Sequence, residues 1–231
     1  MSHPLRLHHE LLLLALHDDK GTVQVSGMLD LGIAGALFCE LIFEERVELR
    51  PEGRRGRPLT TVLSRATFGD EVLDEALRRL IDAKRRANPQ NTVISLSRMK
   101  KLRARTAVAL CRRGILRESE DRVLWLFRRR IYPTVDPKPE AALIDRIRTA
   151  IEQPEVEVEP RTALLVTLAN LVGALRPIYS RKELRTHKAR LKQLKSLGGA
   201  GSEATHKAIE AAQAAMAAGV AASAAATSAS T

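Results

Sequence analysis

The sequence predicts a mainly α-helical protein, a single globular helical-bundle domain with two short β-hairpins. Apolar residues recur at helical spacing through most of the chain, and Asp70–Ile81 is also acidic at its start and basic at its end, as the helix dipole prefers. Strand-like runs bounded by turn residues occur in just two places. Hydrophobic residues make up 45% of the chain but aromatic residues only 3%, so aliphatic side chains must build the core.

The first predicted helix, Leu5–His17, is apolar on almost every side because it contains the run Leu11–Leu16. Such a helix is buried either among other helices or in a membrane. A helix needs about 20 residues to span a bilayer, so this short run predicts the start of a helical core. A turn at residues 18–21 (DDKG) ends it, and a second helix is expected at Asp30–Glu44, with Asp30 as its N-cap.

Two hairpins are expected from short runs of β-forming residues. The strand Arg46–Leu49 should pair with Leu59–Leu63 across a loop rich in glycine, proline and arginine. The second hairpin is predicted to turn at the acidic residues Glu118–Asp121, with Ile115–Arg117 and Arg122–Phe127 as its strands.

The remaining helices are predicted from amphipathic runs and from residues that start or stop helices. Ser180 and Glu183 have capping-box spacing at the start of the last one, and Gly114 ends the central one. Residues Asn88–Asn91 should break the chain. The helices expected after the first hairpin are Asp70–Ile81, Ile94–Arg113, Glu140–Glu152, Thr162–Leu175 and Arg181–Leu197.

The glycine-rich segment Gly198–Gly201 predicts a boundary in the chain. We expect a helical domain over residues 1–197 and, over residues 198–231, a glycine linker, an Ala-rich final helix and a frayed tail. The sequence shows neither a signal peptide nor a transmembrane segment, so a cytoplasmic protein is expected.

The charge of the chain predicts an anionic partner. It carries 38 basic and 27 acidic residues, which gives a net charge of +11. Such an excess is typical of proteins that bind nucleic acid or phospholipid headgroups. Composition does not distinguish between these two partners.

Motifs for catalysis are absent from the sequence. There is no Walker loop, no G-x-G-x-x-G after a strand, no H-E-x-x-H and no G-x-S-x-G. His8 and His9 have no nucleophile–base pattern around them, and Cys39 and Cys111 lie in aliphatic helical runs that predict burial. The sequence therefore predicts a protein that is not an enzyme and that has no metal site and no cofactor.

The predicted helix Ile94–Arg113 carries the strongest candidate binding residues. Projected at about 100° per residue, its apolar side chains form one arc, and opposite them lies a basic stripe of Arg98, Lys101, Arg105 and Arg112. Arg103 falls inside the apolar arc and Lys100 just beyond its edge. Arg103 therefore either pairs with a buried carboxylate or snorkels to solvent, or it forms with Lys100 a pocket for a phosphate.

The second hairpin combines apolar and cationic residues. Its apolar part consists of Leu124, Trp125, Leu126 and Phe127. These side chains either pack on the core or anchor the hairpin at a membrane interface, where aromatic residues lie beside cations that attract anionic lipid. The supporting basic surface would then consist of Arg98, Lys101, Arg105, Arg128, Arg129 and Arg130.

A helix followed by a glycine stop and a basic hairpin is also the pattern of a winged-helix DNA-binding element. In that alternative Arg98, Lys101 and Arg105 would contact phosphates or base edges. Two observations oppose it: no short helix joined by a tight turn is predicted before Ile94–Arg113, only the break at Asn88–Asn91, and the predicted hairpin turn Glu118–Asp121 is acidic.

Several short motifs occur together in a fixed order. They are Glu10–Leu16 (ELLLLAL), Asp18–Gly21 (DDKG), Gly35–Leu41 (GALFCEL), Arg46–Leu49, Asp74–Leu77, Leu102–Arg105, Arg113–Leu116 and Arg161–Leu165. In this order and spacing the sequence resembles the Golgi phosphoprotein 3 family, over Leu5 to Ala218. The many arginines and alanines are typical of GC-rich genomes and indicate a bacterial member.

The resemblance implies a mostly helical domain, here residues 1–197, that binds phosphatidylinositol 4-phosphate on membranes. Two basic residues of the family's lipid pocket correspond to Lys100 and Arg103. The pocket's arginine on the second helix corresponds to Ala34, and its tryptophan falls near Val25 or Ser26, so half of that contact set is absent. A binder of anionic phospholipids in general is therefore an alternative.

The resemblance also implies partners and a location. Eukaryotic members recruit the cytosolic tails of Golgi glycosyltransferases, and the family hairpin, here Leu124–Phe127, mediates self-association near the membrane. The expected partners are thus anionic phospholipid headgroups, tails of membrane enzymes and a second copy of the chain. The expected location is the cytosolic face of a membrane, the Golgi in a eukaryotic cell.

Overall fold

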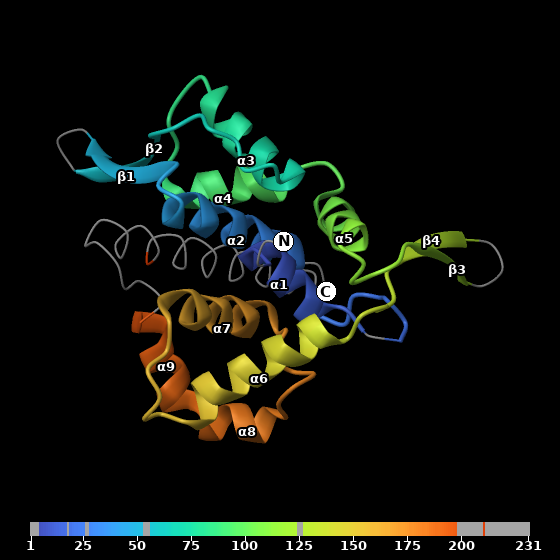
Figure 1. Ribbon diagram of the computed structural model, residues 1–231. Helices are drawn as coiled ribbons and strands as arrows, with labels where there is room; N and C mark the ends of the chain where they lie inside the picture. Colours follow the sequence, from blue (N-terminus) through green and yellow to red (C-terminus); the bar gives the residue numbers. More distant parts are fainter. Residues whose placement is uncertain are drawn as a thin grey trace, which may run out of the picture.

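The computed structural model describes residues 5–17, 19–25, 28–52, 56–123, 127–197 and 210. In chain order, the elements are α1 (Leu7–Ala15), α2 (Leu29–Phe43), β1 (Val47–Glu52), β2 (Arg57–Val62), α3 (Glu71–Ile81), α4 (Pro89–Ser97), α5 (Leu102–Arg112), β3 (Ser119–Val123), β4 (Phe127–Ile131), α6 (Lys138–Glu152), α7 (Pro160–Val172), α8 (Arg181–Thr186) and α9 (Lys188–Leu197). The strands form two separate antiparallel pairs, β1 with β2 and β3 with β4. The predicted fold class, mainly α with two hairpins, is confirmed (Figure 1).

Helices α1 and α2 form the centre of the molecule (Figure 1). They pack against each other, and α2 also contacts α3, α4, α5 and α7, while α1 also contacts α5, α6 and α7. Every residue of α1 is buried, including its polar residues. The apolar run of α1 therefore lies among other helices, as predicted. Among the described helices, none is both long and apolar enough to cross a bilayer.

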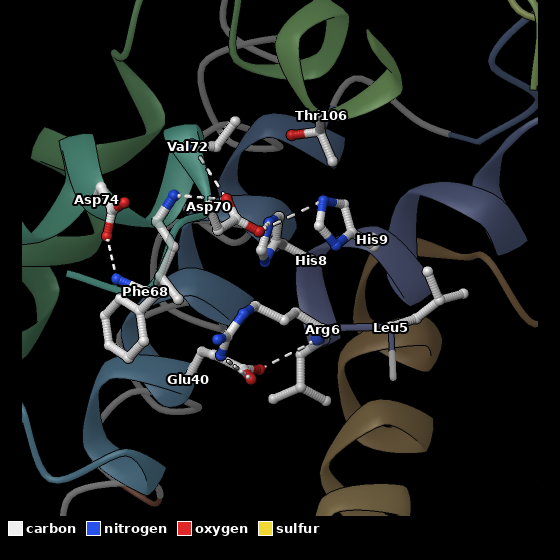
Figure 2. Close-up of polar contacts among 12 residues, drawn as sticks. Leu5, Arg6, His8, His9, Glu40, Phe68, Asp70, Val72, Asp74 and Thr106 are labelled. Carbon is white, nitrogen blue, oxygen red and sulfur yellow. Dashed lines mark hydrogen bonds and ion pairs between the residues drawn. The ribbon is translucent and has the colours of Figure 1, made fainter. Parts of the chain in front are cut away.

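Glu40 of α2 joins three segments of this core, although only 1% of its side chain is exposed. Its carboxylate accepts two hydrogen bonds from the Arg161 guanidinium on α7, at 3.1 and 3.0 Å. It also accepts from Arg6 Nη1 at 3.3 Å and from the backbone N–H of Leu7, at the start of α1, at 3.1 Å. Figure 2 shows the Arg6–Glu40 pair. One buried carboxylate thus fixes α1, α2 and α7 to one another.

The prediction of one long helix over Ile94–Arg113 was wrong. The chain forms α4 and α5 instead, and Lys101 between them has the left-handed conformation φ 55°, ψ 35°, which ends a right-handed helix. The Asn88–Asn91 segment starts α4 rather than breaking the chain. The Asn88 side chain accepts from the Asn91 N–H at 2.8 Å, and Pro89 occupies the first turn, where its missing N–H costs little.

The ends of other helices also differ from the prediction. Helix α1 is shorter than Leu5–His17, and α2 starts after Met28 with no cap from Asp30, because the Asp30 carboxylate binds Arg103 instead. The predicted last helix is divided at His187 into α8 and α9. The capping box of Ser180 and Glu183 is confirmed.

The predicted turn of the second hairpin was wrong as well. Ser119 pairs with Ile131 and Val123 with Phe127, so the acidic residues lie along β3 and not at a turn. Asp121 stands opposite Arg129, and their side chains form an ion pair at 2.6 Å. Opposite charges facing across strands favour this register. Leu124, Trp125 and Leu126 lie outside the described residues, as does the predicted tail from residue 198 onward apart from Glu210.

Candidate functional site

A pocket of about 390 Å³ lies where the end of α1, the following segment, α5 and β4 meet. Leu12, Leu16, Ala104 and Ala107 give it an apolar wall. Arg103 of α5 and Arg129 and Arg130 of β4 are also among its lining residues. The structure thus brings together cations that the sequence analysis had assigned to two different segments.

Arg103 is held by a carboxylate from a distant part of the chain. Its Nε and Nη2 donate to the two carboxylate oxygens of Asp30 at 2.6 and 2.7 Å, and 40% of its side chain is exposed. The hydrogen bonds to Asp30 raise the pKa of Arg103 further, so it is always charged. Arg103 therefore pairs with a carboxylate, as one alternative predicted, but the Asp30 side chain is 36% exposed and not buried. The same side chain also lines the pocket, and its Nη1 edge has further N–H donors.

Lys100 does not line this pocket. It lies exposed between α4 and α5, next to Lys101, and Arg98 is exposed on the same connection. These three cations therefore form a solvated surface beside the start of α5. The contact of Lys100 with a lipid phosphate stays a prediction.

Arg105 faces helix α3. It binds Glu71 at 3.2 Å and makes a second ion pair with Glu75. Partial burial would raise the pKa of Glu75, but hydrogen bonds from Arg105 and Arg79 lower it below its ordinary value. Arg105 is thus bound within the fold, and its predicted place in a free basic surface is not what the structure shows.

The cations of β4 are also paired. Arg129 donates to Asp121, and Arg130 lies 3.0 Å from Glu118. Both side chains are more than half exposed, at 52% and 59%, and therefore remain accessible to an anion. The side chains of Phe127 and Arg128 lie outside the described residues.

Sequence reasoning missed a second basic cavity, of about 360 Å³, between β2, the end of α3 and the start of α4. Its arginines are Arg65, Arg79, Arg85 and Arg86, and Thr61 and Ser95 add hydroxyl groups. Arg79 and Arg86 already bind Glu75 and Glu52. The cluster Lys84–Arg86 directly after α3 was the signal that could have indicated it.

The order α4, turn, α5 and hairpin is also that of a winged helix, so the objection that no helix precedes α5 was wrong. The charges nevertheless do not suit DNA. Arg105 and Arg112 of α5 both bind the carboxylate of Glu71 on α3. The negative charge of Glu71 would repel DNA phosphates from this face of α5. The order of elements thus fits a winged helix, but the pairing of Arg105 and Arg112 with Glu71 opposes the DNA-binding alternative.

Comparison with known proteins identifies the chain. It matches the family model described as Golgi phosphoprotein 3 (GPP34) over residues 7–212, which is most of its length. No individual curated protein matches it. The match begins at α1 and includes every described element, both hairpins and the basic pocket among them. The chain belongs to the Golgi phosphoprotein 3 family.

Proposed function

We propose that this chain is a non-enzymatic peripheral membrane protein that binds a phosphorylated lipid headgroup in the pocket between α5 and β4. The headgroup is phosphatidylinositol 4-phosphate where that lipid is present, or another anionic phospholipid. The observation that carries the proposal is the convergence of Arg103, Arg129 and Arg130 on one cavity with an apolar wall. Family membership supports the same ligand class.

The chemistry of the pocket suits a phosphate with an attached apolar chain. Its volume of about 390 Å³ is in the range of small-molecule sites. Guanidinium groups bind phosphate oxygens with two parallel hydrogen bonds. Each of the three arginines has a carboxylate partner, Asp30, Asp121 or Glu118, so the cations are oriented before the ligand arrives. Pre-orientation lowers the entropy cost of binding.

The proposal is tested by liposome co-sedimentation at about physiological salt. Three vesicle types are compared: neutral lipid, neutral lipid with phosphatidylglycerol, and neutral lipid with phosphatidylinositol 4-phosphate, the two anionic mixtures matched for charge. Selective sedimentation with the phosphoinositide supports a specific pocket, and equal sedimentation with both anionic vesicles supports a general anionic-lipid site. No sedimentation with any vesicle overturns the proposal.

Replacing Arg103 by alanine should weaken vesicle binding roughly 10- to 100-fold, because a hydrogen bond to a charged group contributes roughly 1.5–3 kcal/mol. Arg85→Ala is the matched control, since it removes the same charge from the second basic cavity. The measurement is the apparent partition coefficient of each variant. A loss in Arg85→Ala with unchanged binding in Arg103→Ala would place the lipid in the second cavity.

Replacing Asp30 by asparagine should strengthen vesicle binding about fivefold. The change removes a negative charge that competes with phosphate for Arg103, and one unit charge near an anionic surface contributes on the order of 1 kcal/mol. Asparagine keeps the size of the side chain and one oxygen acceptor. Titration with increasing vesicle concentration measures the shift, and weaker binding than wild type would mean that Asp30 mainly positions Arg103.

We further propose that the chain docks on a cytosolic membrane face, the Golgi in a eukaryotic cell, and acts there as an adaptor for cytosolic tails of membrane enzymes. Family membership supports this role. The residues Leu124–Phe127 remain the proposed membrane-contact or self-association segment. Pull-down with immobilised tail peptides, with and without vesicles, tests the adaptor role.

A further inference from the structure

A buried cluster of two histidines and one carboxylate joins α1 to the start of α3. His8 and His9 are 0% and 2% exposed, and their Nε2 atoms lie 3.3 and 3.6 Å from Oδ2 of Asp70. Their ring centroids are 4.0 Å apart. Figure 2 shows both imidazoles turned toward the Asp70 carboxylate. Consecutive residues of a helix point about 100° apart, and the planes of the two rings are inclined to each other by 39°.

The ring nitrogens of this cluster lack hydrogen-bond partners within the described part of the chain. Both nitrogens of His8 and both of His9 are buried without one. Buried polar atoms are nearly always satisfied, and each exception needs an explanation. Imidazole nitrogens are among the commonest metal ligands in proteins.

The two distances from Asp70 to the histidines are compatible with a shared metal ion. In a tetrahedral site with bonds of about 2.0–2.1 Å, neighbouring ligand atoms stand about 3.3 Å apart. The two observed Nε2–Oδ2 separations, 3.3 and 3.6 Å, are close to that value and long for a charged hydrogen bond. All three candidate ligand atoms lie within 4.8 Å of one another.

Backbone hydrogen bonds to one oxygen of the Asp70 carboxylate already fix its orientation. Oδ1 of Asp70 accepts the backbone N–H groups of Val72 and Leu73 at 3.1 and 3.0 Å, as the N-cap of α3. Oδ2 is thereby directed at the histidines. Hydrogen bonds of this kind to a metal-ligating group fix its direction and are common around metal sites.

We propose that His8, His9 and Asp70 bind a divalent transition metal ion such as Zn²⁺, with a solvent molecule as the fourth ligand. Two imidazoles and a carboxylate are a common zinc ligand set. The ion would connect α1 to the N-cap of α3, next to the Glu40 cluster in Figure 2. The bound ion would stabilise the helical core, and this proposal does not depend on the proposed lipid site.

The test starts from full-length protein freed of metal with a chelator and titrated with Co²⁺, whose visible absorption reports tetrahedral coordination. We expect one equivalent per chain, displacement by Zn²⁺, and a rise of roughly 5–10 °C in melting temperature at saturating Zn²⁺. His9→Gln and Asp70→Asn should each abolish the absorption, and Asn at position 70 retains the ability to cap α3. His187→Gln, at the junction of α8 and α9, is the control and should retain it.

The outcomes separate a metal from the alternatives. No Co²⁺ absorption in the wild type, with an unchanged melting temperature, overturns the proposal and leaves buried water as the partner of the ring nitrogens. Absorption that survives in Asp70→Asn overturns the assignment of the ligands. If His9→Gln fails to fold, Asp70→Asn carries the test.

Discussion

Replacing Glu40 by alanine should lower the free energy of unfolding by about 3 kcal/mol, because removing one member of a buried ion pair leaves its partners uncompensated. Glu40 accepts hydrogen bonds from two arginines and from the first N–H of α1. Arg6 and Arg161 retain 23% and 30% exposure, so water relieves part of their loss, and the lower end of the usual 3–5 kcal/mol range is expected. The melting temperature should fall by about 6–12 °C.

Urea denaturation of Glu40→Ala beside Glu44→Ala tests this expectation. Glu44 binds the same Arg6 at 3.1 Å but is 42% exposed, so its loss should cost well under about 1 kcal/mol. Glu40→Gln keeps the shape and the acceptor oxygen, and should lie between the two. Equal stability of the Glu40 and Glu44 variants would mean that the buried carboxylate does not hold α1, α2 and α7 together.

Features set by neighbouring residues could be predicted from the sequence. The all-round apolar run of α1 correctly indicated burial, and the Ser180–Glu183 spacing correctly indicated a helix start. The division of the helical stretch after Asn88 into two helices could not be predicted in this way. It depends on a left-handed backbone at Lys101, and lysine is not a residue that indicates a turn. Apolar periodicity continues across that residue and therefore suggested one helix.

Features set by distant residues could not be predicted in this way. Asp30 and Arg103 are separated by 73 positions, so a capping role for Asp30 was the natural local interpretation. The helical projection did single out Arg103 as a charge that needs a partner, but it could not name the partner. The pocket also depends on the β3–β4 register, which the cross-strand pairs of Asp121 and Glu118 with arginines favour. Arg129 and Arg130 are neighbours on β4 and point to opposite faces of the hairpin, and a one-residue change of register would exchange those faces.

Adding a single methyl group at Gly21 should also have a large effect on stability. Its φ is +58°, and an added Cβ would lie 2.2 Å from the backbone N of Pro133 and 2.3 Å from the carbonyl carbon of Tyr132. Backbone atoms cannot move aside as a side chain can. The segment around Gly21 would therefore have to separate from the end of β4, and the hydrogen bond from the Tyr132 N–H to the Gly21 carbonyl, 2.9 Å long, would be lost. We expect Gly21→Ala to cost about 3 kcal/mol of stability.

The same substitution should remove lipid binding, because Gly21, Thr22 and Val23 form one side of the proposed pocket and Arg130 and Tyr132 another. Gly56→Ala is the control that separates the strain of a positive φ from the clash with neighbouring backbone. Gly56 has nearly the same φ, +55°, but nothing lies within 4 Å of its Cβ position. This substitution should therefore cost about 1 kcal/mol and leave vesicle binding intact. Both variants are compared by urea denaturation and by co-sedimentation at a temperature where each is folded. If Gly21→Ala remains folded and binds vesicles as the wild type does, the headgroup does not enter between α5 and β4.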